Sequence, residues 1–174
     1  MLEVHLVMLR LQDSNFVLLC FSEDKDGVLL DGRDCVLCLK DKDEAERYCH
    51  ANGLILRTTS PNYDIDQVMV TLELKRRTTS EPITWERNEC NGVINAWNLF
   101  SDVNLSLGMK SLGDSTALND VYEKLFFGMN QPAITPEGQC YAPGFSKEEL
   151  ALLEKILNEY IQVFLNSVKP ADLT

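Results

Sequence analysis

The sequence has few of the residues on which enzymes most often depend. Only two histidines occur among its 174 residues. His5 lies in a predicted strand and His50 near a predicted helix end, and neither has the surroundings of a catalytic base or of an H-E-x-x-H zinc site. The chain also lacks a G-x-S-x-G nucleophile elbow and a glycine-rich phosphate loop. We therefore expect a protein that is not an enzyme and carries no cofactor.

Long hydrophobic runs are missing as well. No stretch approaches the roughly 20 apolar residues of a membrane span. The first residues, MLEVHLVMLRL, place Glu3, His5 and Arg10 where a signal peptide needs a continuous apolar segment. Most of the six cysteines lie in apolar runs, where a free thiol behaves as a small buried hydrophobe. We expect a cytoplasmic protein with reduced thiols that does not contact membranes.

Positive charge is scarce relative to negative charge. Sixteen Lys and Arg residues oppose 27 Asp and Glu residues, which gives a net charge of −11. Such a chain repels nucleic acid and favours basic protein partners. The only basic cluster, Lys75 to Arg77, is too short to form a nucleic-acid groove. The alternative is that the negative charge serves only solubility.

The first half of the chain is predicted to be rich in strands. Residues 2–11 and 15–22 predict two strands joined by a turn at Gln12 to Asn15, and residues 28–41 predict further strand. The alternation of apolar and polar residues over 67–76 predicts another strand with one covered face. Between these strands, residues 41–54 predict a short helix that Asp41 or Asp43 caps and that ends at Gly53.

The second half is predicted to be rich in helices. Val93, Ile94, Trp97, Phe100 and Val103 recur at steps of three and four, which predicts a helix over 89–107. A second helix is expected over 115–128 with Asp114 as its cap, and a third begins at the capping box of Ser146 and Glu149. We therefore predict one α+β domain over residues 1–174. An antiparallel sheet from the strand-rich residues 1–80 packs against helices of the helix-rich residues 88–168.

Two motifs suggest a metal site, and both have simpler readings. Cys35 and Cys38, with Cys49 nearby, have the spacing of zinc or redox thiols. The residues between the first two continue a strand-like run, however, so buried structural cysteines are favoured. Asp24 and Asp26 resemble the start of a calcium loop, but Arg33 stands where that loop needs its last glutamate, and a hairpin turn is favoured. We expect no metal.

The excess of acidic residues is concentrated toward the two ends of the chain. Much of the excess near the N-terminal end lies in the loops at 23–34 and 41–46. Loops held by a rigid scaffold commonly carry binding residues. We therefore take Asp24, Asp26, Asp31 and Asp34 as candidate residues for binding a basic partner. A merely solvated acidic loop is the alternative.

Two segments, residues 94–108 and 120–157, resemble the small bacterial immunity proteins of polymorphic toxin systems, in particular those of contact-dependent growth inhibition. The resemblance covers between a third and two-fifths of the chain, and it includes no motif that carries a mechanism. The residues that carry it are Asn95, Trp97, Asn98, Leu99, Phe100, Asp102, Tyr122, Leu125, Phe126, Phe127, Gly128, Asn130, Pro132 and 135–138.

The resemblance implies a small cytosolic protein without enzymatic activity. It would bind the C-terminal domain of one cognate toxin, often a basic nuclease, and block the active site or substrate groove of that toxin. Two alternatives remain at the level of sequence. One is a small enzyme or redox protein that uses zinc or the thiols of Cys35, Cys38 and Cys49, and the other is a generic protein-binding adaptor.

Overall fold

A computed structural model describes residues 2–57, 61–78, 81–109 and 115–168. It contains both helices and strands, with the main sheet in the N-terminal half and the longest helices in the C-terminal half, so the α+β prediction is confirmed. The elements in chain order are β1 (Glu3–Leu11), β2 (Ser14–Ser22), β3 (Asp26–Val28), β4 (Cys38–Leu39), α1 (Lys42–Ala51), β5 (Ile55–Arg57), β6 (Asn62–Asp64), α2 (Ile65–Arg76), β7 (Ile83–Thr84), α3 (Arg87–Ser106), α4 (Thr116–Gly128), β8 (Gly144–Phe145) and α5 (Lys147–Ser167).

The main sheet is built on the β1–β2 hairpin. Gln12 and Asp13 form its turn with φ angles of 50° and 58°, the left-handed backbone that a two-residue hairpin turn requires. Strands β3 and β4 pair antiparallel with β2, whereas β5 and β6 pair parallel with β1. The sheet is therefore mixed rather than wholly antiparallel, because the chain passes through α1 before it returns to the free side of β1.

The two faces of this sheet are covered by different helices. Alternation along β1 directs Val7, Leu9 and Leu11 into the large core shared with α2, α3, α4 and α5. Val4 and Leu6 face the opposite side and form a smaller core with residues of α1. Both faces of β2 are buried, which explains its nearly continuous apolar sequence FVLLC.

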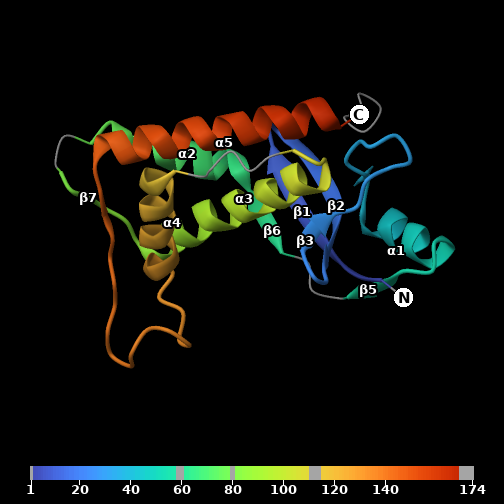
Figure 1. The fold of residues 1–174 in the computed structure, drawn as a ribbon, viewed down its shortest axis with the longest axis horizontal. Coiled ribbons are helices and arrows are strands. Elements are labelled where there is room, and N and C mark those ends of the chain that lie inside the picture. The colour runs from blue at the N-terminus through green and yellow to red at the C-terminus, as the bar shows by residue number, and fades with distance from the viewer. Residues whose placement is uncertain (1, 58–60, 79–80, 110–114, 169–174) are drawn as a thin grey trace.

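Helix α5 crosses the molecule and holds the large core together, as Figure 1 shows. Its capping box at Ser146 and Glu149 is confirmed, and its 21 residues span about 31 Å. Phe164 near its end lies 5.2 Å from Phe16 of β2 and 5.7 Å from Phe100 of α3, measured between ring centroids. No helix among the described residues combines the length and the apolar character needed to cross a bilayer.

The predicted strand over 67–76 is wrong, because these residues belong to helix α2. Asp64 caps this helix by accepting a hydrogen bond from the Gln67 N–H at 2.9 Å. Ile65 and Leu72, seven residues apart, are 1% exposed, whereas Val70 and Leu74 are 48% and 60% exposed. The apparent period of two therefore included residues that the helix leaves in solvent.

Among the smaller predictions, one is confirmed, one is wrong, and one concerns a residue outside the described ranges. The helix capped by Asp41 is confirmed as α1, and Gly53 follows it with a φ of 66°. The strand predicted over 28–41 is mostly loop, since Val28 is the last residue of β3 and Cys38 and Leu39 form β4. Asp114, the predicted cap of α4, lies outside the described residues, and the side chain of Ser115 caps this helix.

Candidate functional site

The pairing of β1, β2 and β3 brings polar side chains together at one end of the sheet. His5 of β1 lies opposite Cys20 of β2, and Ser22 lies opposite Asp26 of β3. Cys20 and Ser22 are two residues apart, so their side chains share a face of the sheet. The Ser22 hydroxyl donates a hydrogen bond to the Asp26 carboxylate. The apolar face of the sheet thus ends in a polar cluster.

Helix α3 covers this cluster and adds a second carboxylate to it. The hydroxyl of Ser106 accepts a hydrogen bond from the backbone N–H of Val28 at 2.9 Å and donates one to the backbone carbonyl of Asp102 at 2.8 Å. The close approach requires Gly27, since an added Cβ atom would lie 2.8 Å from the Ser106 Oγ. Docking of the helix on β3 in this way places the side chain of Asp102 near Asp26.

The result is a cavity of about 180 Å³ that we call the acidic cavity. Asp26 and Asp102 are its two acids. The residues lining it are His5, Val7, Cys20, Phe21, Ser22, Asp26, Tyr63, Asn95, Asn98, Leu99 and Asp102.

Burial perturbs the ionisable groups of the acidic cavity. Desolvation, together with the negative charge of Asp26, raises the pKa of Asp102 to about 6. Desolvation lowers the pKa of His5 despite the opposing effect of Asp26, so this imidazole is mainly neutral at pH 7. Desolvation also raises the pKa of Cys20 to about 12 and raises the pKa of Tyr63. The cavity therefore contains two carboxylates but no cationic group of its own.

Nine basic side chains of the described chain form ion pairs with other acids. Lys75 contacts Glu89 of α3 at 2.8 Å, and Arg76 contacts Glu154 of α5 at 2.6 Å. No ion pair among the described residues includes Asp26 or Asp102. What distinguishes these two carboxylates is that they line one cavity with no cation of the described chain paired with either.

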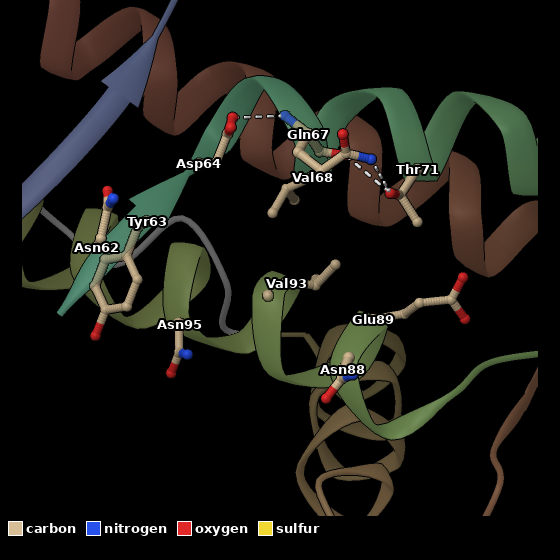
Figure 2. A pocket seen from close by; sticks show the side chains of 11 residues that line it. Asn62, Tyr63, Asp64, Gln67, Val68, Thr71, Asn88, Glu89, Val93 and Asn95 are labelled. Carbon is tan, nitrogen blue, oxygen red and sulfur yellow. Dashed lines mark hydrogen bonds between the residues drawn. The ribbon is translucent and has the colours of Figure 1, made fainter. Parts of the chain in front are cut away.

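A larger groove of about 390 Å³ adjoins the acidic cavity and lies between α2, α3 and β6. We call it the central groove. In Figure 2 the side chain of Val68 points from α2 toward α3, where Val93 lies, and polar side chains surround this apolar centre. The residues lining the groove are Asn62, Tyr63, Asp64, Gln67, Val68, Thr71, Asn88, Glu89, Gly92, Val93 and Asn95. Tyr63 and Asn95 line both spaces.

The structure separates the four aspartates predicted from the sequence. Asp26 lines the acidic cavity, and Asp24 is exposed in the turn before it. Asp31 organises the next loop, because its carboxylate accepts hydrogen bonds from the backbone N–H groups of Arg33 and Cys35. Those bonds lower the pKa of Asp31. Asp34 follows in the same loop, exposed, with a left-handed φ of 59°. Asp26 alone of the four lies in the candidate site.

Sequence reasoning did not identify Asp102 as a site residue, although a signal for it exists. Asn95, Asn98, Asp102 and Ser106 recur at steps of three and four along α3 and form a polar stripe beside the apolar one. Three of these four residues line the acidic cavity. The same three belong to the segment that resembles immunity proteins.

The cysteines expected under the alternative reading do not converge. Cys38 packs against the large core, whereas Cys49 lies in the small core on the other face of the sheet. All six cysteines are free, and within the described ranges no group of His, Cys, Asp and Glu side chains has the arrangement of a metal site. The zinc or thiol alternative therefore gains no support from the geometry.

Comparison with protein-family models, with curated proteins and with solved structures finds no match to this chain.

Proposed function

We propose that this chain is an immunity protein that binds a basic toxin domain and blocks the active site or substrate groove of that toxin. The observation that carries the proposal is the acidic cavity, in which Asp26 and Asp102 have no cationic partner within the described chain. Asp102 is half-buried beside the exposed Asp26, so its negative charge is costly alone, and a positive side chain from a partner relieves that cost.

The overall charge of −11 supports the same proposal, since it attracts a basic partner from a distance. Toxin domains that cleave nucleic acid need cations to hold the phosphate backbone, and those cations are the natural targets of an acidic inhibitor. A lysine or arginine of the toxin would enter the acidic cavity and be withdrawn from substrate binding. Electrostatic complementarity of this kind speeds association and sets specificity.

The test uses the full chain as bait at low salt, with captured proteins identified by mass spectrometry. We expect the C-terminal domain of a large secreted protein with a basic surface. Co-production of that domain with the chain should restore growth to cells that the domain alone kills. Capture of an unrelated housekeeping protein, with no protection against any toxin domain encoded beside this chain, would overturn the proposal and favour the adaptor alternative.

Kinetics with the captured domain then test the site itself. Asp26→Asn combined with Asp102→Asn should slow association about tenfold at low salt and flatten its dependence on salt. Asp24→Asn combined with Asp34→Asn is the matched control, because it removes two exposed negative charges outside the acidic cavity. Equal association rates for the Asp26→Asn and Asp102→Asn variant and for the control would remove the acidic cavity from the binding surface.

A further inference from the structure

We propose that the central groove and the acidic cavity form one continuous trough that binds an extended segment of the partner protein. In this arrangement carboxamide side chains contact the main chain of the segment, and the acidic cavity receives a lysine or arginine near one of its ends. The inference rests on the proposed function, because it assigns the part of the partner that the chain recognises.

The floor of the central groove is apolar and is already open. Val68 of α2 and Val93 of α3 provide it, together with the bare backbone of Gly92. A Cβ atom added at Gly92 would lie 3.4 Å from the Val68 Cγ2, which is an ordinary contact. Because Gly92 has no side chain, a space remains between the two helices that a larger side chain would fill. Such a floor suits the apolar side chains of a bound segment.

Polar groups around this floor have unused hydrogen-bonding capacity. The carboxamides of Asn88 and Asn95 and the hydroxyl of Tyr63 make no hydrogen bond within the described part of the chain. The side-chain amide of Gln67 donates one hydrogen bond to the Thr71 hydroxyl at 3.3 Å, and its side-chain oxygen Oε1 accepts none within the described part of the chain. A carboxamide both donates and accepts, as a peptide group does, so it complements a main chain.

The length of the trough favours a segment of chain over a small molecule. Tyr63 and Asn95 line both spaces and join them. The lining residues of α3 run from Asn88 to Asp102, a distance of about 21 Å at the helical rise of 1.5 Å per residue. An extended chain advances about 3.3 Å per residue, so the trough accommodates about six residues.

Charge sets the direction of the bound segment. At the Asn88 end of the trough, Glu89 is paired with Lys75 at 2.8 Å. Asp64, which lies beside Tyr63 in Figure 2, is 3.7 Å from Arg10. At the other end the acids of the cavity are unpaired. A basic residue of the segment is therefore attracted to one end of the trough only.

The probe is a phage-displayed library of random octapeptides, selected on the immobilised full chain at low salt. We expect enriched peptides to share an apolar centre and a lysine or arginine near one end. Gly92→Leu, which fills the groove, should weaken the binding of synthetic versions of these peptides at least tenfold, which is about 1.4 kcal/mol. Gly92→Ala, and Asn158→Leu on the exposed side of α5, are the controls and should change the affinity less than about threefold.

Two further measurements separate the parts of the inference. Asn88→Ala combined with Asn95→Ala removes the free carboxamides without filling the groove, and it should weaken peptide binding about tenfold. Replacement of the basic residue of the peptide by glutamine should weaken binding to the wild-type chain but not to the variant with both Asp26→Asn and Asp102→Asn.

Enrichment of no peptide, or peptide binding that Gly92→Leu leaves unchanged in a folded variant, would overturn the inference. The proposed function is tested separately with the toxin domain. Toxin binding that survives Gly92→Leu but is lost in the Asp26→Asn and Asp102→Asn variant would refute the trough and retain the immunity function. Toxin binding that depends on neither change would refute the trough and remove the acidic cavity from the binding surface, whereas failure to bind or neutralise any toxin domain would refute the immunity function.

Discussion

Replacement of Asp102 by asparagine should make the protein more stable at neutral pH. The carboxyl of Asp102 is half-buried, and its pKa is raised from 3.8 to about 6 by desolvation and by the charge of Asp26. Asp102→Asn keeps the size and most of the hydrogen-bonding capacity of the side chain and removes the charge. The charged carboxylate of Asp102 therefore lowers the free energy of unfolding of the native protein.

The size and the sign of this effect follow from the pKa. The difference between 3.8 and about 6 corresponds to about 3 kcal/mol at ~1.4 kcal/mol per pH unit. Solvent screens a half-buried group, so we expect about 1–1.5 kcal/mol. The folded state holds the proton of Asp102 more tightly than the unfolded chain does. The free energy of unfolding of the wild type therefore falls as pH rises from about 3.8 to about 6, and the variant lacks that loss.

Urea denaturation between about pH 4 and pH 8, followed by the fluorescence of the buried Trp85 and Trp97, measures this difference. The variant should exceed the wild type in stability at about pH 8, and the two should converge near pH 4. Asp24→Asn removes an exposed acid of the neighbouring turn and should show no such gap. A variant that is less stable at pH 8, or a gap that does not shrink on acidification, would refute the electrostatic account of the acidic cavity.

Three further predictions concern binding, packing and thiol reactivity. The affinity for a basic partner, measured by titration calorimetry, should fall as pH drops below about 6, because protonation of Asp102 removes its charge; affinity that is constant from pH 7 to pH 5 would contradict this. Phe164→Ala should lower the free energy of unfolding by about 3–5 kcal/mol in urea denaturation, since its fully buried ring packs against β2 and α3; a loss below about 1 kcal/mol would contradict the packing. A brief pulse of maleimide should label the exposed Cys140 before Cys20 and Cys90, because burial of the latter two raises their pKa values to about 12 and about 11. Mass spectrometry of the labelled peptides measures the order, and labelling of Cys20 or Cys90 before Cys140 would contradict this prediction.

Elements with local signals in the sequence could be predicted well. The β1–β2 hairpin has polar turn residues between two apolar runs, and α5 begins at a capping box in which Ser146 and Glu149 bond reciprocally. In both cases the residues that determine the element are neighbours in the chain. The α+β class follows from such elements, since it depends only on their types and order.

The candidate site could be predicted only in part, because the residues of the acidic cavity come from five separate elements. Asp26 was found as an acid in a turn, but its proximity to Asp102 depends on how α3 docks on β3. That docking rests on the contact of Ser106 with Val28 and on the absence of a side chain at Gly27. No local pattern records a contact between residues so far apart in the chain. The polar stripe of α3 was visible, yet nothing in it shows which surface it faces.

The opposite effects expected for Asp102 on stability and on binding distinguish a functional residue from a structural one. If the carboxylate served the fold, its removal would lower stability together with any binding. If it serves a partner, its removal stabilises the free protein and weakens the complex. The uncompensated charge lowers the stability of the free protein, and a cation of the partner removes that penalty on binding. Asp31 provides the contrast within the same chain. Its carboxylate is satisfied by two backbone N–H groups, so Asp31→Asn should lower stability whether or not a partner is present.

The error over residues 67–76 bears directly on the site. As a strand, this segment would have extended the sheet and left α3 beside a flat surface. As helix α2 it lies across from α3 and provides Val68 and Gln67 as one wall of the central groove. The side chain of Asp64 caps the start of α2 and Lys75 near its end pairs with Glu89, and the absence of a side chain at Gly92 leaves space beside Val68. The sequence of residues 67–76 suits both an alternating and a helical pattern. Side-chain contacts with α3 and α5, which exist only in the folded chain, favour the helix, and the groove depends on that helix.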